Sequence, residues 1–186
     1  MILSNNKRPK DEHGELLTDQ YSTPEDVVNM VRGFWGLGKP ILDLAGSESN
    51  KKAPFVLTRE QNSLNVDWAD MMSVLGMFEF STPNPEIDKS LAWLQPPYSK
   101  ELLGKFVKKA YFEAGAGMNI LALLPVSTST KWFHKYIYTL PPCNYRFIEG
   151  RIKFIPPPGL ELKENRPMGD NIAVYFTSEV CNKEEN

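Results

Sequence analysis

Residues 118–126, MNILALLPV, form the most apolar run in the chain. A run of this length suits a strand buried on both faces, whereas a strand with one solvated face would alternate polar and apolar side chains. Strands buried on both faces belong mainly to parallel sheets, because the helices that connect parallel strands cover the faces of the sheet. The run therefore predicts a central strand of a mostly parallel sheet.

Strand-like and helix-like segments alternate along most of the remaining chain. Shorter apolar runs predict further strands in KPILDLAG (39–46), PFVLT (54–58) and LAWLQ (91–95). Apolar residues at helical spacing predict helices in TPEDVVNMVRGFWG (23–36), KELLGKFVKKAYFEAG (100–115) and STKWFHKYIYTL (129–140). In the first of these helices, Thr23 is the expected N-cap and Pro24 opens the first turn. This alternation is typical of α/β proteins.

The carboxy-terminal part shows a different pattern. YRFIEGRIKFI (145–155) has two strand-like arms about a turn at Glu149 and Gly150, and NIAVYFTSEV (171–180) predicts a last strand. We therefore predict a three-layer α/β sandwich with a mostly parallel sheet and an antiparallel hairpin at the end.

The chain has 186 residues, of which 41% are hydrophobic, and this suits one domain with a sizeable core. The sequence predicts a flexible N-terminal arm over residues 1–20, a domain over 21–178 and a C-terminal tail over 179–186. The two cysteines match no zinc spacing, so no metal is expected. No secretory signal and no apolar run of about 18 residues are visible, which favours the cytoplasm and no membrane.

The formal net charge of −2 argues against a general attraction to polyanions. Nucleic-acid binding would then need a local basic face, and basic residues interleave with aromatic ones in the carboxy-terminal third. Taken singly, each is more simply explained as a solvated charge. The candidates for DNA contact are Lys131, Lys135, Arg146, Arg151 and Lys153.

Ligands of open parallel sheets collect at the carboxyl ends of the strands. After the strand at 39–43, DLAGS offers an acidic residue and small residues that allow close approach to the backbone. An alternative is that Asp43 serves only in a turn and that Glu60 is a solvated loop charge. The candidates for cofactor contact at these strand ends are Asp43, Leu44, Ala45, Gly46, Ser47, Glu60 and Asn62.

QPPY, residues 95–98, follows the strand at 91–95. Pro96 and Pro97 fix φ and lack an N–H, so the carbonyl groups beside them point outward in a rigid frame. Gln95 adds an amide with an acceptor and donors, and Tyr98 adds a flat ring. A planar amine such as the N6 group of adenine could use all of these features, although a structural loop after a strand explains an isolated PPY equally well.

Several strings in the chain together resemble the phage-type, Dam-like DNA N-6-adenine methyltransferase family. QPPYS resembles the catalytic motif, in which the family has Asp, Asn or Ser before Pro-Pro-Tyr, and ILDLAGSESN resembles the cofactor loop. The resemblance covers about residues 21–177. The other matching strings are YSTPEDVV (21–28), NSLNVDW (62–68), LLPVSTSTKWFH (123–134) and RFIEGRIKF (146–154).

The resemblance implies a Rossmann-like class I methyltransferase fold, S-adenosylmethionine as cofactor and adenine N6 in double-stranded DNA as acceptor, with phage or prophage DNA modification as the setting. It implies that Gln95 and the Pro96 carbonyl hold N6 while Tyr98 stacks on the flipped base. Toward the cofactor, it implies Thr23 and Pro24 at the amino-acid end, Asp43 at the ammonium, the loop at 44–47 beside it, and Glu60 or Asn62 toward the ribose.

Two departures from the family pattern leave alternatives open. Gln95 is one methylene longer than Asn, and the cofactor loop reads Asp-Leu-Ala-Gly rather than Asp-Pro-Cys-Ala. The protein could instead methylate another planar amine, such as cytosine N4, an RNA base or a protein glutamine, or it could be a non-catalytic relative that binds cofactor or DNA. Segments 70–90 and 156–171 are the candidates for target readout. The oligomeric state stays open, and a monomer fits the composition.

Overall fold

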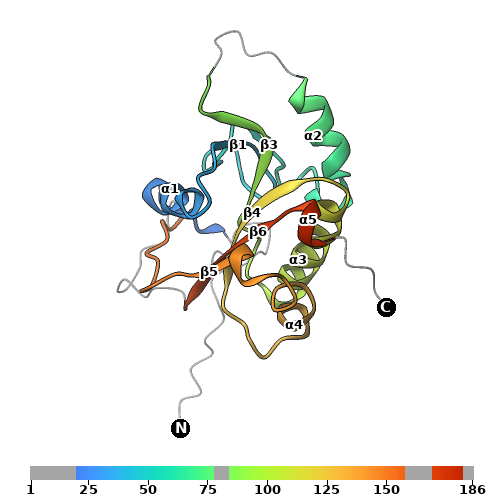
Figure 1. Ribbon diagram of the computed structural model, residues 1–186. Coiled ribbons are helices and arrows are strands. Elements are labelled where there is room, and N and C mark those ends of the chain that lie inside the picture. Colours follow the sequence, from blue (N-terminus) through green and yellow to red (C-terminus); the bar gives the residue numbers. More distant parts are fainter. Residues whose placement is uncertain (1–19, 78–83, 158–168, 182–186) are drawn as a thin grey trace.

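The structure is a computed structural model that describes residues 20–77, 84–157 and 169–181 (Figure 1). The strands are β1 (Lys39–Asp43), β2 (Phe55–Val56), β3 (Ile87–Leu94), β4 (Asn119–Pro125), β5 (Tyr145–Phe147) and β6 (Asn171–Phe176). The α-helices are α1 (Glu25–Gly33), α2 (Trp68–Gly76), α3 (Lys100–Gly115), α4 (Lys131–Tyr136) and α5 (Ser178–Cys181). Two short 3-10 turns complete the elements, η2 (Ser63–Asn65) and η3 (Pro142–Asn144).

The six strands form one mixed sheet in the order β2-β1-β3-β4-β6-β5. β2, β1, β3 and β4 are parallel, whereas β6 runs antiparallel to both β4 and β5. The predicted α/β class is confirmed. β4, the strand predicted to be central, lies between β3 and β6, and all its residues from Ile120 to Leu124 are buried.

Side chains on the two faces of the sheet belong to two separate hydrophobic clusters, as the alternation along a strand requires. Ile120, Ala122 and Leu124 of β4 pack in the cluster that contains the buried residues of α2, α3 and α4. Leu121 and Leu123 pack in the other cluster, with α1 and the segment at 152–154. Both faces of β4 are therefore covered, which explains why its sequence is apolar without alternation.

The predicted hairpin about Glu149 and Gly150 is wrong. Gly150 does turn the chain with φ of +76°, but β5 pairs with β6 rather than with the residues after the turn. Ile155 instead forms an isolated antiparallel bridge with Ser22, with N–H···O distances of 2.9 and 2.8 Å. The alternating pattern after the turn has another cause: Ile152 and Phe154 are buried in the cluster that contains α1.

Segment 70–90, a candidate for target readout, is mostly ordinary secondary structure where the structure describes it. Its first part belongs to α2, and its last part, from Ile87, is the amino end of β3. Asp67 caps α2 by accepting from the Asp70 N–H at 2.9 Å, and Met72 and Leu75 enter the core. Figure 1 shows α2 and α4 at opposite ends of the molecule.

Several predictions lie partly outside the described residues. The arm at 1–19 and most of the loop at 156–171 fall there. At the C-terminus, α5 continues past residue 178, so the predicted tail begins inside a short helix. The domain boundaries stay a prediction.

Candidate functional site

The strand order reverses at β1, because the chain goes from β1 to β2 on one side and returns to β3 on the other. Crevices at such a switch point, at the carboxyl ends of the strands, are the usual ligand sites of open α/β sheets. A pocket lies at this point between the ends of β1 and β3. It is lined by Tyr21, Ser22, Asp43, Ala45, Gly46, Asn50, Lys52, Trp93 and Gln95.

Asp43, the last residue of β1, organises the loop that follows it. Its Oδ1 accepts from the Ala45 N–H at 3.1 Å, and its Oδ2 accepts from the Lys52 N–H at 2.9 Å. The backbone carbonyl of Asp43 also accepts from the Leu57 N–H at 2.8 Å, next to β2. One side chain therefore closes the loop from residue 45 to residue 52, which confirms a turn role without excluding contact with a ligand.

The Asp43 side chain is almost fully buried at 3% exposure. Burial raises the pKa of its carboxyl from the ordinary 3.8 to about 6, while the N–H groups of Lys52 and Ala45 act in the opposite direction. A buried carboxylate in a pocket has a strong electrostatic preference for a cationic ligand group, because such a group restores the solvation that burial removes.

Gly46 lets the loop backbone lie close against this carboxylate. A Cβ at residue 46 would lie 2.7 Å from Asp43 Oδ2, too close for a real side chain, and 3.0 Å from Val56 Cγ2, which is a tight contact. The loop can pack this closely against Asp43 and Val56 only because position 46 carries no side chain. Small residues are predicted here for the close approach of a ligand, and that role stays a prediction.

Gln95, directly after β3, is held by two residues that precede α1. The Thr23 hydroxyl donates to Gln95 Oε1, and Gln95 Nε2 donates to the Tyr21 carbonyl at 3.3 Å. Thr23 is fully buried. Its expected role as helix cap is wrong: α1 begins after Pro24 with no side-chain cap, and the Thr23 hydroxyl is used at Gln95 instead.

Tyr98 is anchored at the end of β4. Its hydroxyl donates to the Leu123 carbonyl at 3.2 Å and lies 3.4 Å from Asn171 Oδ1 of β6, and its ring meets Phe154 edge-on at 6.2 Å between centroids. Burial raises the pKa of the Tyr98 phenol above its ordinary value, so the hydroxyl keeps its proton. Pro96 is buried beneath the motif. The ring is thus fixed at its hydroxyl end while the residue stays partly exposed.

A chain of buried hydrogen bonds holds the backbone of the loop after β1. Ser63 Oγ donates to the Leu44 carbonyl at 2.5 Å, and Trp68 Nε1 donates to the Ser63 carbonyl at 2.8 Å. Leu44 itself is fully buried, and its N–H donates to the Trp93 carbonyl at 2.9 Å. The backbone of the loop after β1 is therefore tied to η2, α2 and β3.

Other predicted cofactor residues do not line the pocket. Glu60 and Asn62 are exposed beyond β2, and Ser47 donates its N–H to Asn50 Oδ1 at 2.8 Å within the loop. Asn62 has a left-handed backbone with φ of +49°. Pro24 stands at the start of α1. Their roles toward a cofactor stay predictions.

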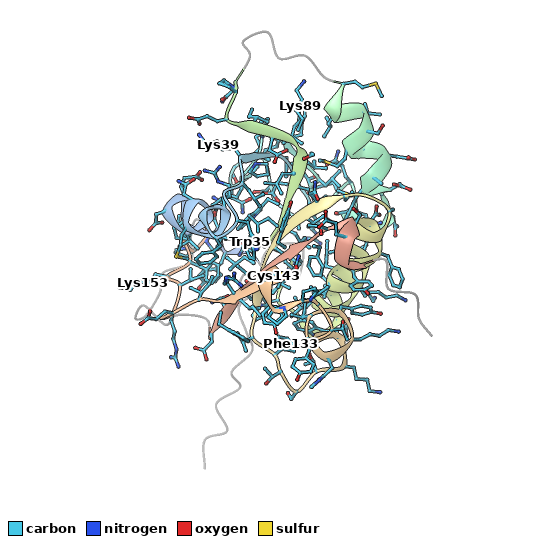
Figure 2. The ribbon with its side chains drawn as sticks, viewed as in Figure 1. Trp35, Lys39, Lys89, Phe133, Cys143 and Lys153 are labelled. Carbon is cyan, nitrogen blue, oxygen red and sulfur yellow. The ribbon has the colours of Figure 1, made fainter. Side chains whose placement is uncertain are left out.

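The predicted basic residues are all exposed, but they lie on elements that pack against different faces of the sheet. Lys131 and Lys135 lie on α4, whose buried Phe133 belongs to one hydrophobic cluster. Arg151 and Lys153 lie beside Ile152 and Phe154, which belong to the cluster on the other face of the sheet. Figure 2 shows Lys153 well apart from Phe133.

Arg146 is engaged locally. Its Nη1 donates to the Pro142 and Tyr145 carbonyls at 2.9 and 3.0 Å, and its guanidinium lies 6.0 Å from the Trp35 ring centroid. Trp35 Nε1 in turn donates to the Cys143 carbonyl at 2.8 Å (Figure 2). Arg146 thus packs at the edge of the sheet, and its contact with DNA stays a prediction.

Sequence reasoning missed five residues of the pocket, namely Tyr21, Ser22, Asn50, Lys52 and Trp93. Nearness in sequence was the available signal for four of them. Two directly precede the Thr-Pro start of the first helix, and two follow the DLAGS turn. Within the described ranges, no group of His, Cys, Asp and Glu side chains is placed to hold a metal ion, and no helix there is long and apolar enough to cross a bilayer.

A family model described as DNA N-6-adenine-methyltransferase (Dam) matches residues 12–180, nearly the whole chain. The chain belongs to this family. A curated relative in the Dam family, the DNA N-6-adenine-methyltransferase of Haemophilus phage HP1 (strain HP1c1), is 29% identical over 138 residues. The matched stretch covers 74% of this chain and 66% of the relative, just under two thirds of its length. No solved structure matches the chain.

Proposed function

We propose that this Dam-family protein transfers a methyl group from S-adenosylmethionine to N6 of adenine in double-stranded DNA after base flipping. The observation that carries the proposal is a single pocket that Asp43 and Gly46 line from one strand end and Gln95 lines from the neighbouring one. The two predicted halves of the site are 52 positions apart in the sequence, so their meeting at the switch point is a property of the fold.

The pocket has the chemistry that S-adenosylmethionine needs. The cofactor supplies a methyl group on a positively charged sulfur, and it also carries an ammonium group. Asp43 offers a buried carboxylate to a cation, and Gly46 lets the loop backbone lie close beside that carboxylate. Asp43 and the backbone of residues 45–47 would hold the cofactor, with Asn50 and Lys52 at the rim.

Gln95, Pro96 and Tyr98 would hold the acceptor. Gln95 Oε1 has a second lone pair besides the one that accepts from Thr23, so it can also accept an N6 hydrogen, together with the Pro96 carbonyl. Tyr98, which is partly exposed as a residue, would offer its ring as a stacking surface for a base rotated out of the duplex. Two acceptors and a ring select a planar amine that presents two N–H groups.

We assign the fold to the Rossmann-like class I methyltransferases, with the three layers expected from the sequence. The reversal at β1, the antiparallel β6 inserted beside β4 and the two hydrophobic clusters support this assignment. Phage or prophage DNA modification in a host cytoplasm is the matching biological setting, given the phage relative.

DNA would approach the carboxyl edge of the sheet between two basic groups. Lys131 and Lys135 stand on α4, which follows β4, and Arg151 and Lys153 stand on the segment that packs against Tyr98 through Phe154. Placed on opposite faces of the sheet, the two groups flank the Gln95 motif. This arrangement suits phosphate contacts on both sides of a flipped nucleotide.

The deciding experiment is transfer of labelled methyl from S-adenosylmethionine to unmethylated duplex DNA, followed by digestion to nucleosides and mass spectrometry. We expect N6-methyladenine with the wild-type protein and almost none with Tyr98→Ala. Parallel reactions contain duplex RNA, or duplex DNA without adenine.

Label in N4-methylcytosine or in RNA would replace the adenine assignment by another planar amine. Cofactor binding without transfer to any of these substrates would end the nucleic-acid assignment and leave a protein glutamine as acceptor or a non-catalytic relative. Equal labelling by wild type and Tyr98→Ala would remove the motif at residues 95–98 from the mechanism.

A further inference from the structure

The direction in which the Gln95 amide points is set by the residues around it. A glutamine has three side-chain torsions, and the last of them is broad and roughly two-fold, so oxygen and nitrogen can exchange places at little intrinsic cost. Only the oxygen can accept a hydrogen from an amine substrate; the Nε2 group would repel it. The proposed chemistry therefore requires one of the two orientations.

Tyr21 and Thr23 together select that orientation. The Tyr21 carbonyl is an acceptor only, so it pairs with Gln95 Nε2 and rejects Oε1. Oε1 then faces Thr23, whose hydroxyl donates to it. An exchanged amide would place two carbonyl oxygens against each other at Tyr21, so the two contacts agree on a single arrangement.

Thr23 has no other evident use for its hydroxyl in the described part of the chain. The side chain is fully buried, it does not line the pocket, and it leaves α1 without a side-chain cap. A side-chain cap normally stabilises the start of a helix, and α1 lacks one. The Thr23 hydroxyl donates to Gln95 instead of capping α1.

The neighbouring residue fixes the position of this segment. Ser22 forms the two-bond bridge with Ile155, next to Phe154 and its contact with Tyr98. Residues 21–23 are therefore held between the carboxy-terminal segment and the end of β3, and they present a donor and an acceptor to Gln95 from a fixed backbone.

We infer that Thr23 is a positioning residue that holds the Gln95 side chain with its oxygen, rather than its nitrogen, directed for acceptance of the substrate amine. The inference rests on the proposed function for the role of Gln95, but the hydrogen bond can be tested without it. Thr23 acts through Gln95 and need not touch the substrate or the cofactor.

The kinetic test compares Thr23→Val, which keeps the shape and removes the hydroxyl, with Thr23→Ser, which keeps the hydroxyl. We expect Thr23→Val to lower kcat by about 10- to 100-fold, the range for a misplaced reacting group, with KM for DNA and for S-adenosylmethionine changed less than about twofold. Thr23→Ser should stay within about threefold of wild type. If Thr23→Val does not fold, Thr23→Ala takes its place.

A second measurement does not depend on activity. In proton–nitrogen NMR spectra, the side-chain amide of Gln95 is identified by its loss in Gln95→Glu. We expect Thr23→Val to shift both amide proton signals and to speed their hydrogen exchange about tenfold, since a free side chain loses its protection. Thr23→Ser should leave them in place. The Gln61 amide, which accepts from the Thr58 N–H at 2.7 Å, is the control that should not move in any variant.

The outcomes separate the two proposals. Unchanged kcat and unchanged Gln95 signals in Thr23→Val would overturn the inference. A raised KM for S-adenosylmethionine with unchanged kcat would also overturn it, because Thr23 would then be a cofactor contact. A wild-type protein that methylates no duplex DNA would end the proposed function, and the NMR comparison alone would decide whether Thr23 positions Gln95.

Discussion

The two loops that form the pocket are held in opposite ways. In the loop after β1, the carboxylate of Asp43 binds N–H groups two and nine residues away, and Asn50 binds a residue three positions away. In the motif after β3, Gln95 binds residues 72 and 74 positions away, and Tyr98 binds residues 25 and 73 positions away. The side chains of the loop after β1 bond mainly within that loop, although its backbone at Leu44 is also tied to Ser63 and Trp93. The side chains of the motif after β3 bond instead to distant parts of the fold.

Because of this difference, we expect mutations to affect the loop after β1 and the motif after β3 in different ways. A self-bonded loop needs the right residues within a short stretch, so changes inside it should harm cofactor binding first. A motif held from distant segments should lose its geometry when any of those segments moves, while the cofactor half stays intact. Measurements of cofactor binding and of turnover can therefore be separated by mutation.

The largest expected effect concerns the buried carboxylate of Asp43. Its folded-state pKa of about 6 lies above the ordinary 3.8, so the folded protein binds this proton more tightly than the unfolded chain does. The contribution of Asp43 to stability is therefore fully present below about pH 4 and is lost as the pH rises to about 6, an effect of about 3 kcal/mol at most. Urea unfolding of the cofactor-free protein at several pH values, compared with Asp43→Asn, measures it.

In that comparison, the free energy of unfolding of wild type should fall relative to Asp43→Asn between pH 4 and 6. A difference that stays constant across this range would show that the N–H groups of Lys52 and Ala45 offset the effect of burial on the Asp43 pKa.

The second prediction removes the ring of Tyr98. Tyr98→Ala should lower kcat/KM by about 10- to 100-fold, since base–aromatic stacking contributes about 1 to 3 kcal/mol. Affinity for S-adenosylmethionine, measured by calorimetry, should change less than about twofold. Tyr98→Phe keeps the ring and loses only the bonds to Leu123 and Asn171, so a few-fold loss is expected. An equal loss of cofactor affinity in Tyr98→Ala would show that cofactor binding and the motif after β3 cannot be separated by mutation.

The third prediction concerns the space for the cofactor beside Asp43. Gly46→Ala places a methyl group 2.7 Å from Asp43 Oδ2, so the loop must shift and affinity for S-adenosylmethionine should fall about tenfold, or roughly 1.4 kcal/mol. Gly33→Ala, at the end of α1 with no atom within 4 Å of the new methyl group, is the matched control and should bind normally. Normal cofactor affinity in Gly46→Ala would place the cofactor elsewhere.

The smallest expected effects concern the two basic groups. Changing Lys131 and Lys135 together to Ala, or Arg151 and Lys153 together, should weaken DNA binding a few-fold at moderate salt. Each pair should reduce the slope of log affinity against log salt by about 2. Changing both Lys39 and Lys89, labelled at the other end of the molecule in Figure 2, is the control and should leave the slope unchanged. A reduced slope of log affinity against log salt in that control would mean that DNA also contacts the end of the molecule that carries Lys39 and Lys89.

The parts of the fold that could be predicted are those with a strong local pattern. β4, α3 and the strand end at Asp43 follow from apolar runs, helical spacing and small residues. The helix α2 was missed because Met and Val residues on its exposed side hid the period, although Asp67 before Trp68, Met72 and Leu75 was a usable signal. The pairing of Ile155 with Ser22 has no local signal, so the alternating pattern around Ile155 predicts a hairpin that the fold does not contain.

The same limit applies to the candidate site. Asp43, Gly46 and Gln95 were predicted because each stands at a strand end in a short, distinctive string. The bonds that orient Gln95 join it to residues more than 70 positions away, and no property of YST at 21–23 points to them. Local chemistry can thus be read from sequence, whereas the orientation of a side chain depends on which distant backbone meets it.

The position of β6 between β4 and β5 has a consequence for synthesis of the chain. β4 ends at Pro125, but its partner on that side begins only at Asn171. Until the ribosome has released those later residues, the most apolar strand of the sheet carries an open edge, and exposed apolar edges invite pairing with other chains. A nascent or prematurely terminated chain that stops before β6 therefore presents an unpaired strand edge, so chaperone protection would matter most between the synthesis of β4 and that of β6.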